Sequence, residues 1–366
     1  MIEMVKHSQV VWSSTETYNT DDIIQYDGNF YKSTVNDNVG LTPDEHPGAW
    51  EVVGGGYIHY VIAPSDAVNA DKADLVLTGV PAEDRTAINQ AIEDLHQARG
   101  EDTDIAIRID FLGGNIDLGT KTDGYAIVIP AGYDNIHLYG NGVNITGDVH
   151  GSSYSNVHGI LDIQSDGVIF DGFDIFNSSE DDNSLSTRNS GTNCTITGNT
   201  CSGGYRALYN AGTNCTITGN TCSGEYGLYN TGANCIITGN TCSSNYGNGL
   251  NNMGSDCIIT GNTCSSNYGS GLYNTGTNCT ITGNTCSSYE FGLTNAGTNC
   301  TITGNTCSGD YEFGLTNNTT DTTNKVIILG NVCITGGFRS RINTCLPGTD
   351  TATMEQFNSG SFTEMT

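Results

Sequence analysis

A short segment recurs along the second half of the chain at an almost constant period. NCTITGNTCS occupies residues 193–202, and near-copies begin at residues 214, 234, 256, 278 and 299. The asparagines after the glycine of each copy are separated by 21, 20, 22, 22 and 21 residues: Asn199, Asn220, Asn240, Asn262, Asn284 and Asn305. A period of this length indicates a solenoid, in which each unit buries its apolar face only against its neighbours.

The apolar pattern distinguishes between solenoid classes. Leucine-rich repeats have a similar length but need several leucines per unit, and these units have one, in segments such as GLYN. The apolar stretches alternate with period two, and Gly and Asn separate them. IHLYGNGV (136–143), VIFDGFDI (168–175) and VIILGNVC (326–333) align with the copies. The sequence therefore predicts an all-β fold, a parallel β-helix of about ten coils.

The cysteines are expected to form two columns inside this β-helix. Cys194 and Ile196 point the same way because they are two residues apart, and Cys201 and Leu208 complete the inward set of one coil. A narrow coil needs small apolar side chains, and a free thiol is one. Disulfides between coils and a structural metal site remain alternatives, although no C-x2-C pair is present. The columns are 194, 215, 235, 257, 279 and 300, and 201, 222, 242, 264, 286, 307 and 333, with Cys345 left over.

The asparagines suggest two hydrogen-bonded ladders. An Asn amide at a corner can donate to the equivalent Asn of one neighbouring coil and accept from that of the other. Such ladders would fix the register that a uniform core specifies weakly. The second ladder is predicted after the leucine: Asn210, Asn230, Asn252, Asn274, Asn295 and Asn317.

Residues 8–54 form a separate, aromatic-rich unit. YNTDDIIQYDGNFYKS predicts a hairpin with its turn at Asp27-Gly28, and the glycines at 54–56 predict a hinge. The pattern resembles small chitin-binding-type carbohydrate modules, with matching aromatic, glycine and proline positions at Trp12, Tyr18, Tyr26, Gly28, Tyr31, Pro43 and Trp50. The segment STVNDNVG departs from the pattern, because chitin binders place exposed tryptophans there. The resemblance implies sugar contacts at Trp12, Tyr18, Tyr31 and Trp50; the alternative is that these rings form the core of the unit.

Residues 57–345 are predicted to be the β-helix, with a cap and first coils at 57–135 and repeats at 136–345. Ile88, Ile92 and Leu95 recur at helical spacing, so residues 83–98 form an amphipathic helix that ends at Gly100. The order of ADLVLTG, this helix and the strands IAIRIDFLGG and YAIVIPAG resembles the N-terminal cap of pectate-lyase-like right-handed β-helices of phage tail fibres and tailspikes. Residues 346–366 are expected to be a polar tail or C-terminal cap.

The charge limits the partners. The chain has 366 residues and a formal net charge of −28, and 31 of the 40 acidic residues lie in residues 1–190. A polyanion of this size repels nucleic acid and anionic membrane, so neither is an expected partner. MIEMVKHSQVVWSS lacks the apolar segment of a signal peptide, and no stretch approaches the roughly 18 apolar residues of a membrane span.

No catalytic residues are predicted, because the repeats hold no aligned carboxylate pair of the kind that glycoside cleavage requires. A cluster of acids near Arg188 could bind Ca²⁺ through oxygen ligands, form a solvated loop, or supply a carboxylate pair: Asp166, Asp171, Asp174, Glu180, Asp181 and Asp182. Calcium is the one cofactor that the sequence suggests. No metal site is otherwise expected.

A row of tyrosines lies in the turn between the second cysteine and the leucine of each unit. The cysteine-to-leucine spacing there varies between 6 and 8 residues, so the turn is expected to bulge outward. The row is Tyr205, Tyr226, Tyr246, Tyr268, Tyr289 and Tyr311, and a second set follows the leucine at Tyr209, Tyr229 and Tyr273. Exposed rings could stack on sugars or pack against other subunits; alternatively, they cover the edge of the barrel.

The resemblance to tailspikes, together with the sugar-type module, predicts a virion protein located in the phage tail, outside the host cell. Its expected function is adhesion to host surface polysaccharide through weak contacts multiplied by copy number. The resemblance also implies a homotrimer and contacts with other tail or baseplate proteins. A polysaccharide depolymerase, acting as a lyase or a hydrolase, and a purely structural fibre or surface-layer protein are the alternatives.

Overall fold

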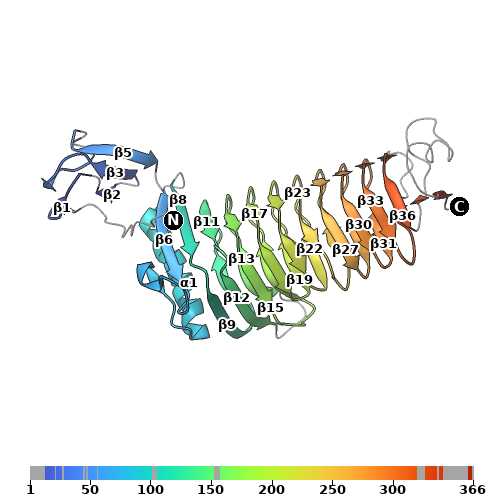
Figure 1. The fold of residues 1–366 in the computed structure, drawn as a ribbon, viewed down its shortest axis with the longest axis horizontal. Coiled ribbons are helices and arrows are strands. Elements are labelled where there is room, and N and C mark those ends of the chain that lie inside the picture. The colour runs from blue at the N-terminus through green and yellow to red at the C-terminus, as the bar shows by residue number, and fades with distance from the viewer. Residues whose placement is uncertain are drawn as a thin grey trace.

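The protein is a right-handed parallel β-helix preceded by a small β unit, as the repeat predicts (Figure 1). The computed structural model describes residues 13–20, 22–26, 29–43, 46, 48–55, 57–100, 105–151, 157–319, 326–335, 338–340 and 362–364. Three long sheets run along the β-helix, and each coil contributes one strand to each of them. Equivalent residues stack in register from coil to coil, as in the pair Ile196 and Ile217.

The first sheet has 12 strands: β7 (Leu75–Val76), β6 (Tyr57–Ala63), β8 (Ala106–Phe111), β11 (Ile136–Tyr139), β14 (Ile169–Asp171), β17 (Thr195–Thr197), β20 (Thr216–Thr218), β23 (Ile236–Thr238), β26 (Ile258–Thr260), β29 (Thr280–Thr282), β32 (Thr301–Thr303) and β35 (Ile327–Leu329). The second has 10: β9 (Asn115–Thr122), β12 (Asn144–His150), β15 (Asp174–Asn177), β18 (Thr200–Gly203), β21 (Thr221–Ser223), β24 (Thr241–Cys242), β27 (Thr263–Asn267), β30 (Thr285–Ser288), β33 (Thr306–Gly309) and β36 (Val332–Thr335). The third has 11: β10 (Tyr125–Ile129), β13 (His158–Ile163), β16 (Ser184–Asn189), β19 (Arg206–Asn210), β22 (Tyr226–Asn230), β25 (Leu250–Asn252), β28 (Ser270–Asn274), β31 (Phe291–Asn295), β34 (Leu315–Asn317), β37 (Phe338–Ser340) and β38 (Phe362–Glu364).

The helix α1 (Pro81–Arg99) caps the N-terminal end of the β-helix, and a short 3-10 helix η1 (Ala70–Lys72) precedes it. Proline begins α1, and the carboxylate of Asp84 accepts hydrogen bonds from the backbone N–H groups of Thr78 (2.8 Å) and Gly79 (3.0 Å). The predicted apolar face of the helix is buried in the same core as the first coils, at Ile88, Ile92 and Leu95. The cap therefore covers the strand edges that an open first coil would expose.

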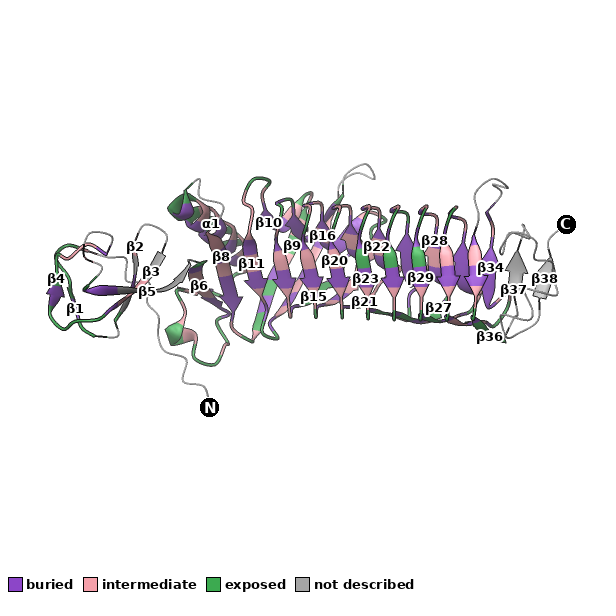
Figure 2. Ribbon diagram, turned by 90° about the horizontal axis from the view of Figure 1, so that it is seen from above, coloured by how far each residue is buried: buried purple, intermediate pink, exposed green. Residues whose placement is uncertain are grey.

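Residues that face the interior are buried along the whole β-helix (Figure 2). Outward positions between them are half-buried or exposed in most strands of the first two sheets, whereas several outward positions of the third sheet, such as Asp162 and Thr316, are buried as well. The first coils fill the interior with large side chains, among them Phe170 and Phe173, whose rings stack with centroids 4.6 Å apart. Later coils use one isoleucine, one leucine and two cysteines each. Uniform, small residues allow the later coils to repeat with nearly constant cross-section.

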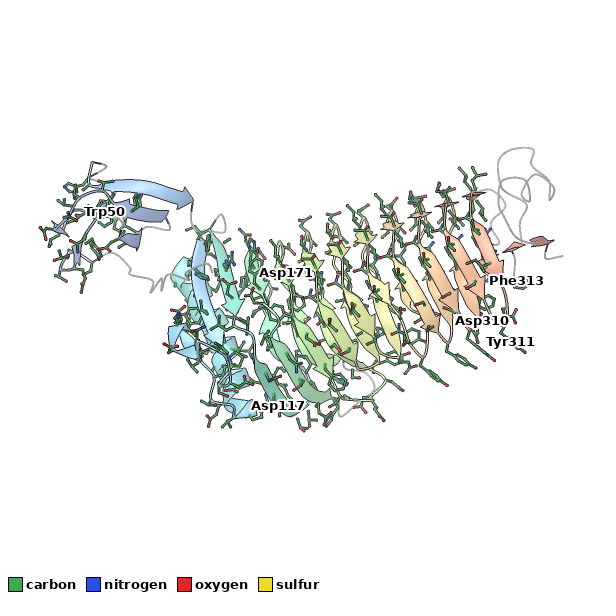
Figure 3. All side chains as sticks on the ribbon, in the orientation of Figure 1. Trp50, Asp117, Asp171, Asp310, Tyr311 and Phe313 are labelled. Carbon is green, nitrogen blue, oxygen red and sulfur yellow. The ribbon has the colours of Figure 1, made fainter. Side chains whose placement is uncertain are left out.

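The small N-terminal unit has its own hydrophobic core. Its sheets are β1 (Thr17–Tyr18) with β4 (Asn38–Val39), and β2 (Ile23–Tyr26), β3 (Asn29–Ser33) and β5 (Trp50–Gly55). Strands β2 and β3 pair antiparallel, which confirms the predicted hairpin. Trp50, marked in Figure 3, packs edge-on against Tyr18, with ring centroids 5.4 Å apart. The division of the chain into units at 8–54, 57–345 and 346–366 stays a prediction.

The burial of two aromatic rings corrects part of the carbohydrate prediction for this unit. Tyr18 and Trp50 each retain 3% exposure, and the indole N–H of Trp50 donates to the carbonyl of Leu41 at 2.7 Å. A buried ring has no face for a sugar, so these two side chains hold the unit together instead. Tyr31 is half-buried against Tyr26, and Trp12 lies outside the described residues.

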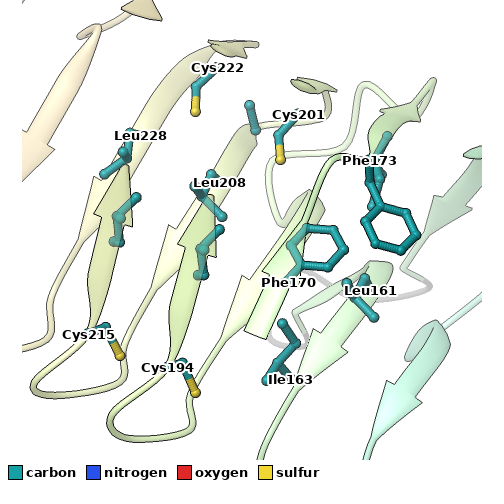
Figure 4. Packing of buried hydrophobic residues seen from close by; sticks show 14 of the residues in the cluster. Leu161, Ile163, Phe170, Phe173, Cys194, Cys201, Leu208, Cys215, Cys222 and Leu228 are labelled. Carbon is teal, nitrogen blue, oxygen red and sulfur yellow. The ribbon is translucent and has the colours of Figure 1, made fainter. Parts of the chain in front are cut away.

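The cysteines form the two predicted columns on opposite walls of the interior (Figure 4). All 13 cysteines in the described part of the chain are buried and free, so disulfides do not link these coils. In-register parallel partners such as Cys201 and Cys222 point their Cα–Cβ bonds in the same direction, which disfavours a disulfide between them. Cys345 lies outside the described residues.

Both asparagine ladders are present and buried. In the first, each amide donates to the side-chain oxygen of the next coil, from Asn199 to Asn331 at 2.9–3.1 Å. The second begins one coil earlier than predicted, at Asn189, and ends at Asn317, with bonds of 2.7–2.9 Å. The two ladders satisfy buried backbone groups at the corners and define the register of every coil between them.

Candidate functional site

The tyrosine row follows the turn between the second and third sheets, along one edge of the β-helix. Figure 3 marks its last member, Tyr311, beside Asp310 on the outer edge of the C-terminal coils. Four rings stack nearly parallel: Tyr246 on Tyr268 (centroids 5.5 Å apart, planes at 8°), Tyr268 on Tyr289 (5.1 Å, 18°) and Tyr289 on Tyr311 (5.7 Å, 10°). The coil spacing of about 4.8 Å between parallel strands brings the rings into this contact.

This stacking limits which tyrosines can bind a sugar. The inner rings, Tyr268 and Tyr289, have a tyrosine on each side and are 50% and 47% exposed. The terminal rings, Tyr246 and Tyr311, are each 72% exposed and have a tyrosine on one side. Because a sugar stacks on a ring face, the terminal rings are better platforms than the inner ones.

The first two tyrosines of the row are arranged differently. Tyr205 and Tyr226 are half-buried and meet edge to face, with centroids 5.2 Å apart. The guanidinium of Arg206 lies 4.9 Å from the ring of Tyr205 and 4.6 Å from that of Tyr229. These cation–π contacts fix the arginine against the third sheet.

The rings of Tyr246 and Tyr268 belong to turns held by a third, shorter ladder that the sequence interpretation missed. The cysteine-to-leucine spacing is eight residues in the units of Tyr246 and Tyr268. Asn245 donates to the side-chain oxygen of Asn267 (2.8 Å) and accepts from the backbone N–H of Gly224 (2.8 Å). An Asn immediately before each of these tyrosines was the available signal.

A groove of about 660 Å³ lies at the start of this edge, over the coils of β15, β18 and β21. Phe176 and Tyr246, both exposed, and the half-buried Tyr205 supply its aromatic walls. Glycines contribute part of the remaining surface, which leaves room for a ligand close to the backbone. The full lining is Phe176, Asn177, Ser178, Ser179, Glu180, Gly203, Gly204, Tyr205, Gly224, Glu225 and Tyr246.

Phe176 was not predicted, although the sequence contains a signal for it. In DIFN, the alternation that buries Ile175 and Asn177 turns Phe176 outward, where it is 43% exposed. A phenylalanine at an outward position of a strand is the kind of apolar exposure that marks a binding surface when it adjoins a hollow.

The groove is acidic. Glu180 and Glu225 line it. Partial burial raises the pKa of Glu225 above its usual value, the negative charge of Asp182 raises this pKa further, and Arg206 opposes both effects. Burial also raises the pKa of the Tyr205 hydroxyl. The groove therefore combines aromatic faces with carboxylates, the groups with which proteins commonly bind sugar rings and hydroxyls.

The predicted acidic cluster upstream is divided among separate structural contacts. Asp166 accepts from the backbone N–H of Thr192 (2.7 Å), and Asp181 accepts from that of Gly151 (3.2 Å). Within the described ranges, no three His, Cys, Asp or Glu side chains converge as a metal site requires. The donor sets in this part of the chain thus do not fit the calcium ion that the sequence suggested.

A polar pair on the outer face of the third sheet was also missed. Asp162 and Arg188 are register partners, and their side chains approach to 3.4 Å. Burial raises the pKa of Asp162 above its usual value. On the next strands, Tyr209 is the register partner of Arg188, and Tyr229 is the register partner of Tyr209. Arg188 therefore lies in the same outward row as the tyrosines that surround Arg206. The outer face of the third sheet is therefore rich in Tyr and Arg over these coils.

Solved structures share the fold at low sequence identity. The Dettilon tailspike protein is 14% identical, with a TM-score of 0.52, and the match covers 83% of this chain and 68% of that one. A mutant tailspike protein of E. coli bacteriophage HK620, solved in complex with a pentasaccharide, is 14% identical, with a TM-score of 0.55 and coverage of 83% and 65%. The chain thus spans about two thirds of the length of these tailspikes.

Sequence comparison adds one family model. The model described as "Periplasmic copper-binding protein (NosD)" matches residues 161–338, slightly less than half of the chain. Comparison with curated proteins finds no match. Among the described residues, no helix has both the length and the apolar character needed to cross a membrane.

The residues of the matched segment do not fit a copper site. Thiolates are the soft ligands that Cu(I) prefers, and the segment is rich in cysteine. However, each column places one thiol per coil in a buried wall. In the first column the sulfur contacts backbone carbonyls; Cys215, for example, lies 3.4 Å from the carbonyl oxygens of Gly191 and Thr213. The described cysteines of both columns are buried, and burial disfavours the charged thiolate that a metal needs.

Proposed function

We propose that this protein is a phage tailspike or tail-fibre component that adheres to host surface polysaccharide through the groove at Tyr246. The observation that carries the proposal is the groove itself: exposed aromatic rings and carboxylates border a hollow on an edge of a β-helix with the tailspike fold. One of the similar tailspikes was solved with a pentasaccharide, which supports a glycan as the ligand class.

The location and assembly belong to the same proposal. The protein acts in the virion tail, outside the host cell, together with other tail or baseplate proteins, and as a homotrimer. The tyrosine- and arginine-rich outer face of the third sheet, around Arg206 and Tyr229, supports subunit packing, because these residue types are enriched at protein interfaces. Several copies would multiply weak sugar contacts into firm adhesion.

The N-terminal unit is proposed to be a second carbohydrate module of the chitin-binding type. Its half-buried Tyr31 supports this role, together with its antiparallel hairpin, which the resemblance to such modules implies. The buried Tyr18 and Trp50 act as the core of this module.

Glycan binding by aromatic variants tests the adhesion proposal. Stacking contributes about 0.5–1.5 kcal/mol per ring, so Tyr246→Ala and Phe176→Ala should each weaken binding to a responsive glycan about 3- to 10-fold. Tyr57→Ala is the matched control, because Tyr57 and Phe176 are each 43% exposed, and Tyr57 lies outside both the groove and the tyrosine row. Binding to host polysaccharide that neither Tyr246→Ala nor Phe176→Ala weakens more than the control does would refute the assignment of the groove.

A depolymerase is the second candidate, and one observation favours it. Glu225 has a raised pKa and a second carboxylate, Asp182, close enough to contribute to that shift. Glycoside hydrolysis uses two carboxyl groups, of which the general acid has a raised pKa. Release of reducing ends from a polysaccharide, abolished by Glu225→Gln, would establish this activity. Unchanged chain length after long incubation would leave adhesion as the function.

A further inference from the structure

The charge around the groove indicates which glycans it accepts. Glu180 and Glu225 are the only ionisable carboxylates in its lining, and no Lys, Arg or His side chain lines it. Arg206 lies nearby, but its guanidinium is held against the rings of Tyr205 and Tyr229. A sugar carboxylate, sulfate or phosphate placed in the groove would therefore meet negative charge and no lining cation.

The same charge continues along the tyrosine edge. Residues 191–319 contain five acidic side chains, and four of them stand beside a tyrosine of the row: Glu225, Glu290, Asp310 and Glu312. Arg206 is the single Lys or Arg in this segment, and the segment contains no histidine. The acids thus gather on the edge that carries the exposed rings, whereas the first sheet has Thr and Ile at its outward positions over the same coils.

We infer that the groove binds glycan segments without negative charge and favours those with free ammonium groups. Two features of the lining attract an ammonium group: a carboxylate, through charge, and an aromatic face, through the cation–π interaction. Neutral sugars make only the stacking contacts with the aromatic rings. Acidic sugars lose affinity, because each like-charge pair at about 4 Å in water changes the binding constant about fivefold.

This inference rests on the proposed adhesion function and makes it more specific. It concerns the ligand charge and not the identity of the sugar. The exposed position of the groove means that salt weakens the effect, since the Debye length is about 8 Å at physiological ionic strength. A charge preference that decreases with added salt is therefore part of the expectation.

Binding of charge-matched oligosaccharides tests the inference. The probes are glucosamine, N-acetylglucosamine and galacturonate oligomers of equal length, together with a panel of neutral and acidic glycans, at a mildly acidic pH that keeps the amines charged. We expect the amine-bearing oligomer to bind at least fivefold more tightly than its acetylated form. Acidic glycans should bind more weakly than the neutral members of the panel.

Two double variants distinguish the effect of the carboxylates in the groove from the effect of the net charge of the whole protein. Glu180→Gln with Glu225→Gln and the control Glu290→Gln with Asp310→Asn change the net charge by the same amount. The first should reduce the preference for the amine-bearing oligomer about fivefold, and the control should leave it nearly unchanged. Circular dichroism of both variants verifies that the fold is retained.

The outcomes are distinguishable. Equal reductions in both double variants would overturn the inference, because the preference would then belong to the net charge of −28. Acidic glycans that bind as tightly as neutral ones would also overturn it, while leaving adhesion intact. If neither the oligomers nor any member of the panel bound, the proposed function itself would fail, and the inference with it.

Discussion

The asparagine ladder predicts a strong effect of exchanging one amide for a carboxylate. Asn262 is buried and makes five side-chain hydrogen bonds. Its oxygen accepts from the backbone N–H of Asn240 (2.9 Å) and from the amide of the same residue (3.0 Å). Its amide nitrogen donates to the carbonyls of Ile237 (2.9 Å) and Thr260 (3.2 Å) and to the side-chain oxygen of Asn284 (2.9 Å).

Asn262→Asp keeps the shape of the side chain but removes both N–H donors. The carbonyl of Ile237 and the side-chain oxygen of Asn284 would then face a carboxylate oxygen. Losing one partner of a buried hydrogen bond costs about 1–3 kcal/mol, so two losses amount to about 2–6 kcal/mol at neutral pH. The result should be a marked decrease in the free energy of unfolding, without a change in packing volume.

The effect should depend on pH with a definite sign. Burial without a cation raises the folded-state pKa of the introduced carboxyl above its unfolded value. The protonated carboxyl can donate one hydrogen bond, and this form is favoured in the folded state. Stability should therefore be lowest above the folded-state pKa and should recover as the pH falls through it.

Urea unfolding at several pH values measures this prediction, with the change in midpoint multiplied by the slope giving the free energy. Asn214→Asp is the matched control, because Asn214 is exposed, and both neighbouring coils carry a neutral Asn at the same corner. The control should change stability by less than about 0.5 kcal/mol. If Asn262→Asp cost no more than the control, the directional ladder would not be a source of stability.

Two further predictions concern the interior. In Gly232→Ala, the new Cβ would overlap the carbonyl oxygen of Gly212, so we expect destabilisation of about 3 kcal/mol or more; Gly48→Ala, with no atom within 4 Å of its Cβ, should change the thermal midpoint little. The cysteines of both columns should react with a thiol reagent only after unfolding, because those in the described part of the chain are all buried. Mass spectrometry of labelled native protein checks this, and rapid labelling of a column cysteine without unfolding would contradict it.

The sequence predicts the parts of this structure that a strict period controls. Cys201, Leu208 and Asn199 recur at fixed intervals, so their columns follow from the spacing of parallel strands. The turn between them varies in length, and its geometry depends on contacts between neighbouring coils. The Asn245–Asn267 ladder and the stacking of Tyr268 are such contacts, and a single repeat does not contain them.

The sequence did not predict the candidate groove, for a related reason. Its walls come from Phe176, in a coil before the cysteine repeats, and from Tyr246, which lies 70 residues later in the chain. The sequence did not show whether Trp50 contacts a sugar or packs in the core, because a tryptophan in a small β unit serves equally well as a core residue. Here the indole is buried and donates to Leu41. Composition does not distinguish the two roles, and only burial does.

The residues that set the repeat period are not those of the variable turn, so this turn can change without disturbing the period. The ladders and thiol columns tie the two corners of each coil to the neighbouring coils, so the turn that carries Tyr246 can lengthen from six to eight residues without shifting the register on either side. Loop insertions of this size cost little chain entropy. Substitutions of the exposed side chains in that turn should therefore alter the ligand while leaving stability nearly constant, whereas substitutions of the buried ladder asparagines should do the reverse. Adhesion and folding thus depend on different residues of the same repeat.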